Sequence, residues 1–326
     1  MIRRREFITL LGSSAAWPVA ARAQHAERMR RIGMLATYQQ DDREGQARVA
    51  AFLDTLRKLG WVEGRNFTIE YRWAAELERI KLSAAELVHL VPDVILVSAP
   101  NALAELQRLS RMIPIVFVQV SDPAGSGFVS GVVRPGGNTT GFENFQVAMG
   151  GKWLGVLKEA APNLRRAAML FGSDVPSNVA FLHAAEMVGP SLGVTVTAID
   201  TYGDIEAAVG SFAREPDGGL IIAPHPNTLA NRGYVLTLAA RHRLPAIYPF
   251  RYYAAEGGLI SYGPDQIDQW RGAATYVDRI LRGEKPGELP VQAPTKFDLV
   301  VNLKTAKALG LSIPAAFPLR ADEVIE

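Results

Sequence analysis

From Arg31 onward this 326-residue chain alternates short β-branched runs with longer amphipathic segments, and it does so in two rounds. Parallel strands need a crossover connection between them, and that connection is usually a helix. Repeated alternation of this kind therefore favours parallel sheets that are covered by helices on both faces. The predicted fold class is α/β, with two doubly wound parallel-sheet lobes.

The first round runs from residue 31 to about residue 119. A helix over residues 44–59 places Val49, Phe52 and Leu56 at helical spacing and ends at Gly60, a residue that suits a helix C-terminus. The other elements predicted for this round are strands over residues 31–36, 66–71, 93–97 and 113–119, and helices over residues 77–91 and 102–111.

The alternation stops between Ser121 and Phe145 and then begins again. Asp122-Pro123 and a glycine-rich run leave no room for a regular helix there, so this stretch is predicted to be a long loop or crossover. Two similar rounds predict two similar lobes, with a hinge and a cleft that closes between them. The second round is predicted to contain helices over residues 152–161, 177–192, 205–214 and 229–243 and strands over residues 167–171, 195–199, 219–222, 246–248 and 259–261, followed after Gly263-Pro264 by a helix over 266–281, a strand over 297–301 and a short helix over 303–309.

The first 23 residues have the three parts of a secretory signal. They are Arg3-Arg4-Arg5, a modestly apolar run from Ile8 to Ala20, and a small-x-small cleavage site that ends at Ala23. The Arg-Arg-Glu-Phe-Ile order resembles the twin-arginine export signal. A broken apolar run of about fourteen residues is too short to cross roughly 30 Å of hydrocarbon. We therefore expect export to the periplasm and no membrane insertion of the mature chain.

The charge balance and the absence of cysteine exclude several classes of protein. The chain has 35 Lys and Arg against 33 Asp and Glu, and removal of residues 1–23 leaves 31 against 32. The basic residues are scattered, so we expect no nucleic-acid partner. The chain has no cysteine, which excludes disulfides, a thiolate nucleophile, Cys-ligated zinc and a lipid-anchored mature terminus.

The chain also lacks the common catalytic signatures. It contains no Gly-x-Ser-x-Gly elbow, no His-Glu-x-x-His, no Walker phosphate loop and no dinucleotide-binding Gly-x-Gly-x-x-Gly. The five histidines do not have the spacing of metal ligands. We therefore expect no enzyme activity, no cofactor and no metal.

Five stretches carry sequence motifs beyond the strand and helix pattern. They are Ser121-Asp122-Pro123, Arg134 to Gly141, Gly258 to Gly263, Leu281 to Pro286 and Leu299 to Leu311. Together these motifs resemble the ABC-transporter substrate-binding proteins related to tryptophan-binding proteins, over residues 31 to about 314.

That resemblance implies a type I periplasmic-binding-protein-like fold with two lobes, three crossovers and no catalysis. It places lobe one at residues 28–141 plus 264–292 and lobe two at residues 142–263 plus 293–326. We also expect a monomer that binds a small solute, either amino-acid-like or an aromatic or carboxylate compound, and delivers it to the membrane permease of an ABC importer.

The candidate ligand-binding residues follow the predicted strand ends, because ligands of open α/β sheets bind outside the carboxyl ends of the strands. A helix start after Ser98 offers N–H groups to a carboxylate, Arg251 could grip an anion, and Tyr252 could stack on a ring. The candidates are Tyr38, Ser98, Asn101, Ser121 and Asp122 in lobe one, Ser177, Asn178, His225, Asn227, Arg251 and Tyr252 in lobe two, and Asp265 at the return crossover.

Each type of candidate has a purely structural alternative that the sequence leaves open. These alternatives are a helix cap for Ser98, Asn101 and Asp265, a turn bond for Asp122, a wall position for His225, a rim position for Arg251 and a core position for Tyr252. Two alternative functions also remain: a solute-binding sensor module for a chemoreceptor or sensor kinase, which needs the same closing lobes, and an exported hydrolase with a dispersed Ser-His-Asp site.

Overall fold

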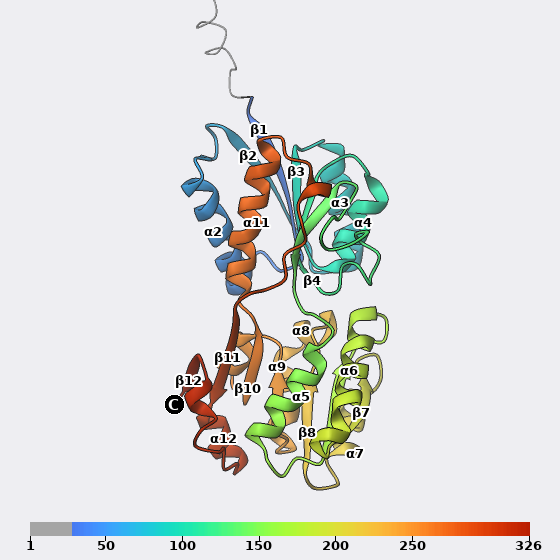
Figure 1. Cartoon of the computed structure of the whole chain (residues 1–326), viewed down its shortest axis with the longest axis vertical. Helices are drawn as coiled ribbons and strands as arrows, with labels where there is room; N and C mark the ends of the chain where they lie inside the picture. Colours follow the sequence, from blue (N-terminus) through green and yellow to red (C-terminus); the bar gives the residue numbers. More distant parts are fainter. Residues whose placement is uncertain (1–27) are drawn as a thin grey trace, which may run out of the picture.

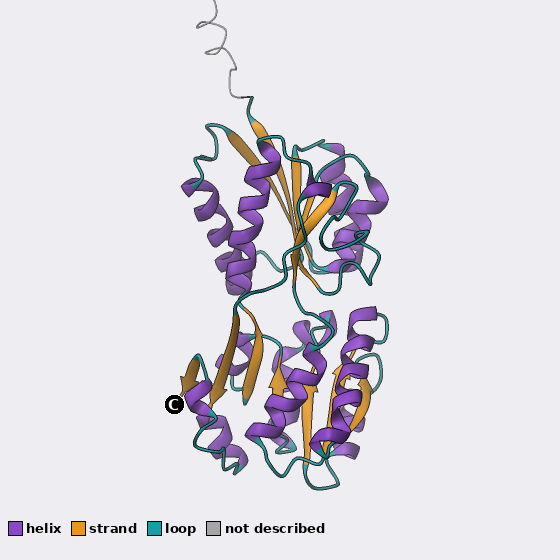
Figure 2. Cartoon of the chain, viewed as in Figure 1, coloured by secondary structure: helices purple, strands orange, loops and turns teal. Residues whose placement is uncertain are grey.

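The computed structural model describes residues 28–326, so the predicted export signal at residues 1–23 lies outside the described residues. Residues 28–326 form two separate sheets with helices packed against them, one above the other in Figure 1. Figure 2 shows the strands of each sheet enclosed by helices. Most strand pairs in both sheets are parallel, which confirms the predicted fold class. We call the first sheet and its helices lobe one, and the second sheet and its helices lobe two.

Lobe one contains five parallel strands in the order β2-β1-β3-β4-β5. The strands are β1 (Arg30–Ala36), β2 (Phe67–Trp73), β3 (Val94–Ser98), β4 (Ile115–Val120) and β5 (Thr139–Glu143). The helices are α2 (Arg43–Lys58), α3 (Leu77–His89), α4 (Pro100–Leu109) and, from much later in the chain, α11 (Gln266–Leu281). In Figure 1 the orange α11 lies beside the blue α2. Helix α2 begins where the Asp42 carboxylate accepts a hydrogen bond from Gly45 N at 2.7 Å.

Lobe two repeats the strand order of lobe one and adds two strands. Its sheet has the order β12-β11-β10-β9-β8-β6-β7, in which β11 runs antiparallel to β10. The strands are β6 (Arg166–Phe171), β7 (Thr195–Asp200), β8 (Gly218–Ile222), β9 (Ala246–Tyr248), β10 (Ile260–Pro264), β11 (Phe297–Asn302) and β12 (Glu323–Ile325). The helices are α5 (Met149–Ala160), α6 (Pro176–Leu192), α7 (Ile205–Phe212), α8 (Pro226–Ala230), α9 (Arg232–Arg241), α10 (Arg251–Ala255) and α12 (Leu303–Leu309).

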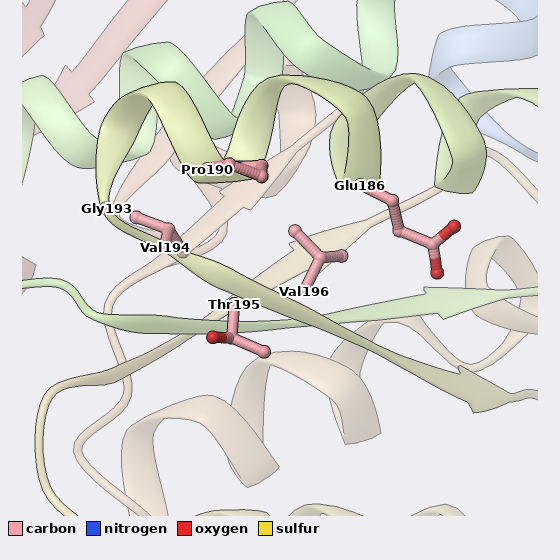
Figure 3. A pocket seen from close by; sticks show the side chains of 6 residues that line it. All are labelled: Glu186, Pro190, Gly193, Val194, Thr195 and Val196. Carbon is pink, nitrogen blue, oxygen red and sulfur yellow. The ribbon is translucent and has the colours of Figure 1, made fainter.

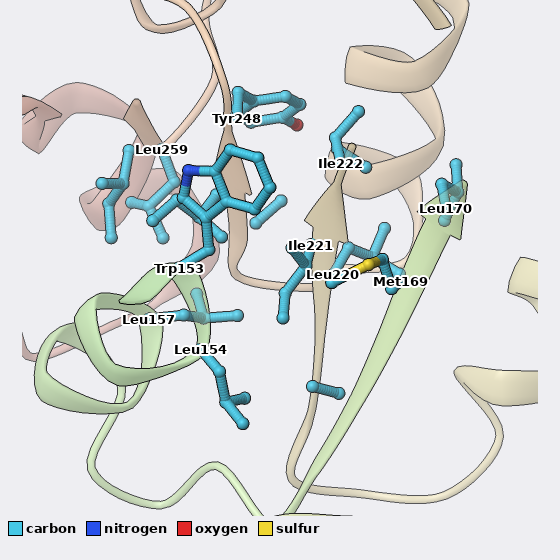
Figure 4. Close-up of a cluster of buried hydrophobic side chains, with 14 of the residues drawn as sticks. Trp153, Leu154, Leu157, Met169, Leu170, Leu220, Ile221, Ile222, Tyr248 and Leu259 are labelled. Atoms are coloured by element: carbon cyan, nitrogen blue, oxygen red, sulfur yellow. The ribbon is translucent and has the colours of Figure 1, made fainter. Parts of the chain in front are cut away.

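Each lobe has its own apolar core around a fully buried tryptophan. Figure 4 shows Trp153, Leu154 and Leu157 on α5 in the core of lobe two, together with side chains of β6 and β8. The indole N–H of Trp153 donates to the carbonyl oxygen of Tyr262 at 2.8 Å. In lobe one, Trp270 on α11 packs edge-on against Phe52, with 6.4 Å between the ring centres.

The loop prediction for residues 121–145 was wrong, because β5 lies inside this stretch. Thr139 and Thr140 are buried and β-branched, which suits a strand. Gly141 allows β5 to approach β4 closely, since a Cβ atom there would lie 2.1 Å from the carbonyl oxygen of Phe117. The glycine and proline residues before Thr139 obscured this short strand in the sequence pattern.

The single helix predicted over residues 229–243 was also wrong. Pro226 begins a first helix, α8, in the position that proline prefers, and Asn231 leaves helical geometry with φ −106° and ψ 28°. Helix α9 then starts at Arg232. The short helix α10 and the edge strand β12 were not predicted at all, because neither is long enough to establish a hydrophobic period.

Three connections join the lobes, and hydrogen bonds hold them together. They lie between β5 and α5, between β10 and α11, and between the 3-10 turn Pro286–Glu288 and β11. Lys296 Nζ lies 2.7 Å from the carboxylate of Asp265, and Gln269 Nε2 donates to the carbonyl oxygen of Glu143 at 2.9 Å. Side-chain hydrogen bonds or ion pairs therefore link each connection to a neighbouring segment.

Within residues 28–326, no helix combines the length and the apolar character that a membrane crossing requires.

Candidate ligand-binding site

The shared strand order places a topological switch point in each lobe. In lobe one the chain leaves β1 and β3 toward opposite sides of the sheet, and in lobe two β6 and β8 do the same. Figure 2 shows that the central strands of lobe two point toward lobe one, whereas β11, which is antiparallel to β10, points away. Ligands of such sheets bind in the crevice outside the carboxyl ends at the switch point. The candidate site is therefore centred on the residues that follow β1, β3, β6 and β8.

Ser98 closes the switch point of lobe one. Its side chain is fully buried, and its hydroxyl accepts a hydrogen bond from Thr37 N at 2.9 Å and lies 3.1 Å from the Thr37 hydroxyl. These contacts tie the ends of β1 and β3 together. Neither Ser98 nor Asn101 caps α4: the cap residue Ala99 has φ 71° and no side-chain hydrogen bond, and the Asn101 side-chain oxygen accepts from Ala102 N. The structure thus gives Ser98 a role that differs from helix capping.

Tyr38 follows β1 and lies next to Arg48 of α2. The guanidinium carbon of Arg48 is 5.0 Å from the centre of the Tyr38 ring, a cation–π distance. Arg48 is buried, with 4% of its side chain exposed, and its one carboxylate neighbour within 4.0 Å among residues 28–326 is Glu44, at 3.9 Å. Burial of a cation costs several kcal/mol, whereas a cation–π contact returns about 0.5–2 kcal/mol. Arg48 therefore lacks a full counter-charge within the described chain.

Tyr252 of lobe two lies opposite these groups of lobe one. Burial raises the pKa of Tyr252 well above its ordinary value, the Tyr253 hydroxyl adds to this, and the charge of Arg48 acts against it. Burial would lower the pKa of Arg48, but Tyr38, Tyr252 and Glu44 together raise it. The Tyr252 ring stacks on Tyr253 and Phe250, with ring centres 5.1 and 5.5 Å apart. A rigid aromatic stack thus presents a hydroxyl to the Arg48 region from the other lobe.

A second polar group lies at the ends of β4 and β5. The Asp122 carboxylate accepts from Gly125 N at 3.0 Å, as the turn alternative predicted, and Asp122 itself has φ 43°. Ser121 beside it is half-buried. Glu143, the last residue of β5, is buried, and burial raises its pKa; a backbone N–H of Asp122 lowers it and the Asp122 charge raises it further. This end of the site is acidic.

At the switch point of lobe two the polar side chains bond to each other. The buried imidazole of His225 lies 3.0 Å from the Asp174 carboxylate through Nε2 and accepts from Asn227 N at 3.2 Å through Nδ1. Tyr202, which is exposed, donates its hydroxyl to the other oxygen of Asp174 at 2.9 Å. His225 also caps α8. The imidazole is therefore a hydrogen-bonded wall of this lobe.

Ser177 and Asn178 lie in the first turn of α6, and both are buried. The Asn178 side chain accepts from Gly172 N at 3.2 Å and donates to the Pro224 carbonyl at 3.1 Å, so it joins the ends of β6 and β8. Both ends of its amide are occupied within the protein. In this structure Asn178 has the same tying role in lobe two that Ser98 has in lobe one.

Arg251 and Asp265 are engaged elsewhere in the protein. Arg251 is exposed and pairs with Glu323 of β12 at 2.6 Å. Asp265 caps α11 by accepting from Ile267 N at 2.9 Å and also pairs with Lys296. Burial would raise the pKa of Asp265, but the bond from Lys296 and the backbone N–H groups lower it. Both side chains therefore already have partners.

The hollow drawn in Figure 3 lies away from all of these residues. It is formed between the last turns of α6 and the start of β7 and is lined by Glu186, Pro190, Gly193, Val194, Thr195 and Val196. This is the amino end of β7, opposite to the carboxyl ends where parallel sheets bind ligands. One charged side chain and no convergent donors make it a poor binding site.

Arg48 and Glu143 are the two residues of this region that the sequence analysis missed. Arg48 had a detectable signal: it directly precedes Val49 and stands four residues before Phe52, so it falls on the buried stripe of the predicted helix. A cation on such a stripe needs a partner. Glu143 had no signal, because the strand that carries it was not predicted.

Comparison with known proteins gives consistent matches over most of the chain. The family model described as ABC transporter substrate binding protein matches residues 40–325. A tyrosine-binding protein from Clostridioides difficile is 24% identical over 266 residues, which cover 80% of this chain and 75% of that protein.

Two solved structures have the same fold. A conserved domain protein from Vibrio cholerae superposes with a TM-score of 0.82 at 24% identity, over 91% of this chain and 100% of that one. An ABC domain from Streptococcus pneumoniae in complex with L-Trp also superposes with a TM-score of 0.82, at 21% identity and with the same coverage.

Proposed function

Since this chain belongs to the ABC transporter substrate-binding protein family, we propose that it binds one small organic solute between its lobes and delivers it to the membrane permease of an importer. The observation that supports this best is the buried Arg48 against the Tyr38 ring at the switch point of lobe one, with Tyr252 of lobe two near enough for its hydroxyl to affect the pKa of Arg48. A solute held by both lobes stabilises the closed state over the open state, and this differential affinity drives closure without ATP in this subunit.

The solute class that we propose is amino-acid-like, or an aromatic or carboxylate compound. Two features support it: tyrosine rings beside a buried cation, and relatives whose names refer to tyrosine and L-Trp. Aromatic side chains recognise rings through stacked or edge-on contacts, and arginine recognises carboxylates. Of the predicted site residues, Tyr38, Ser98 and Tyr252 are the ones we place at the ligand, with His225 and Asn178 as supporting wall.

We further propose that the bending points lie at the three connections, near residues 141, 263 and 292, and that the protein works as a monomer in the periplasm. The basic, apolar and small-residue order of residues 1–23 supports export by the twin-arginine route. Cell fractionation tests the location: substitution of Arg4 and Arg5, the pair that precedes Glu6-Phe7, by Lys should leave the protein in the cytoplasm.

A thermal-shift screen tests the central proposal. The probes are the twenty amino acids, aromatic acids, their amides and simple sugars. A binding probe should raise Tm with its concentration, should reduce the radius of gyration in X-ray scattering, and should be recovered unchanged after the protein is denatured. Conversion of the probe into a product would contradict the proposal and favour an enzyme.

A further inference from the structure

We propose that Arg48, with the hydroxyls of Tyr38 and Tyr252, receives a carboxylate of the solute, so that one anionic group is held by both lobes. This inference rests on the proposed function, because it assigns one chemical group of the solute that the lobes would enclose. Nothing in the family match identifies which residues bind the solute or which of its groups they contact.

The first step is the unmet charge of Arg48. Its side chain is buried, yet the Glu44 oxygen at 3.9 Å lies beyond hydrogen-bonding distance, and 47% of the Glu44 side chain is exposed. An arginine pairs best with a carboxylate through two short N–H···O bonds of about 2.7–2.9 Å. A solute carboxylate at that distance would supply the short charged partner that Arg48 lacks within residues 28–326.

The second step is the orphaned hydroxyl of Tyr38. Its oxygen is buried and has no partner at hydrogen-bonding geometry within residues 28–326, although Ser98 and Arg48 lie near enough to act on its pKa. Buried polar atoms are nearly always bonded, and those without a partner in a native fold need an explanation. Because the Tyr38 ring lies against the Arg48 guanidinium, a carboxylate that pairs with Arg48 can also accept from this hydroxyl.

The third step is the arrival of Tyr252 from the other lobe. Its ring is fixed by stacking on Tyr253 and Phe250, and Arg232 lies over its outer side, 5.6 Å from the ring centre. The charge of Arg48 in lobe one lowers the pKa of the Tyr252 hydroxyl and that of Tyr38 raises it, so both groups lie within electrostatic range of Tyr252. Arg48 and Tyr38 would bind the carboxylate in either state, while Tyr252 would add its bond only on closure.

The room for this arrangement comes from Gly45. A Cβ atom at position 45 would lie 3.2 Å from Cδ2 and 3.3 Å from Cβ of Tyr38. A side chain at position 45 would require the Tyr38 ring to shift by a few tenths of an ångström. The glycine therefore sets the position of the ring without contacting the solute.

Paired acids and amides provide the test. The probes are L-tryptophan and L-tyrosine, each with its carboxamide, and benzoate with benzamide, measured by calorimetry on the full mature chain. On the wild-type protein the best-binding acid should exceed its amide by roughly 30-fold or more, since a buried charge partner is lost. Arg48→Gln should lower the affinity for that acid to the affinity for its amide and leave the affinity for the amide unchanged. Arg57→Gln, on the exposed face of the same helix, should alter neither.

Tyr252→Phe tests how much lobe closure contributes to binding of the acid. It should weaken the acid by about tenfold and reduce the acid-induced compaction seen by X-ray scattering. If Arg48→Gln does not fold, Arg48→Lys replaces it, because lysine keeps the charge but loses the planar two-donor geometry of the guanidinium. It should weaken binding of the acid and leave binding of the amide unchanged. The ratio of acid to amide affinity in the wild type also tests the inference without any variant.

The outcomes are distinguishable. Acid binding that Arg48→Gln leaves intact, or equal binding of acid and amide by the wild type, would overturn this inference and leave the proposed function standing. Binding of neutral sugars alone would do the same. If none of these probes nor any compound of the thermal-shift screen binds, both proposals fail.

Discussion

The two lobes share a strand order but complete their switch points differently. In lobe two, His225, Asp174 and Tyr202 bond to each other, and Asn178 has a partner at each end of its amide. In lobe one, the Tyr38 hydroxyl has no partner within the described residues, and Arg48 has one distant, exposed carboxylate neighbour. A surface whose polar groups already bond to each other is rigid before a ligand arrives. A surface whose polar groups lack partners gains more free energy when a ligand supplies them. We therefore call the switch point of lobe one, with Tyr38 and Arg48, the receiving surface, and we call lobe two, which closes on it, the cover.

The largest expected effect concerns the helix pair that supports the cover. Gly150 on α5 faces α6 so closely that a Cβ atom would lie 1.9 Å from the carbonyl oxygen of Phe181. Because backbone cannot yield as a side chain does, Gly150→Ala should lower the free energy of unfolding by about 3 kcal/mol or more, measured by urea denaturation.

Two matched variants complete this prediction. Gly155 lies on the same helix, and a Cβ atom there would have nothing within 4 Å, so Gly155→Ala should raise the unfolding free energy by up to about 1 kcal/mol. In lobe one, a Cβ atom at Gly272 would meet only the outer ring atoms of Phe142, at 2.4 Å, so Gly272→Ala should cost less than Gly150→Ala. Equal costs in the two lobes would contradict the view that lobe two is the more tightly fixed.

The next effect separates stability from binding. His225→Ala removes a buried imidazole that joins Asp174, Asn227 and Thr201, and should reduce the unfolding free energy by about 2–3 kcal/mol. Tyr202→Phe removes only an exposed hydroxyl bond and should change it by less than about 0.5 kcal/mol. If the cover is preformed, both variants should bind the solute nearly as the wild type does. Arg48→Gln should show the reverse pattern, with weak binding and little loss of stability.

A smaller contrast comes from the two core tryptophans. Both are fully buried, but the Trp153 indole N–H donates to the Tyr262 carbonyl, whereas the Trp270 N–H has no partner within residues 28–326. Replacement by Phe removes a similar volume at both positions and a hydrogen bond at only one. Trp153→Phe should therefore cost about 1–2 kcal/mol more than Trp270→Phe in urea denaturation. The opposite order would show that packing differences outweigh the hydrogen bond.

The sequence predicts the fold better than the site, for a physical reason. Strand and helix periods are local, so helix α11 was predicted with its exact bounds, and only short or glycine-flanked elements such as β5 and β12 were missed. Strand ends are local too, which is why Tyr38, Ser98 and Tyr252 were candidates. That Tyr252 lies near enough to Arg48 for each to affect the pKa of the other depends on how the two lobes lie against each other. Arg251 next to it turns toward Glu323 on the unpredicted strand β12, and no local pattern distinguishes these neighbours.

The smallest expected effect tests the acidic end of lobe one. Glu143 is buried, and within residues 28–326 no Lys, Arg or His lies within 4.0 Å of its carboxylate. Burial raises its pKa above the ordinary value of 4.5, so the folded state holds a proton that the unfolded state has already lost. The stability that Glu143 contributes to the ligand-free wild type, measured as the difference from Glu143→Gln, should therefore fall as the pH rises from below 4.5 through the raised pKa, and then level off. Glu143→Gln cannot ionise and should be the more stable protein near neutral pH, with the advantage vanishing as the pH falls below 4.5.

Glu186→Gln, on an exposed position of lobe two, makes the same chemical change and should leave the pH profile unaltered. A constant difference between wild type and Glu143→Gln across the whole range would mean that folding does not shift the pKa of Glu143, and that this end of lobe one is less costly to the carboxylate than we infer.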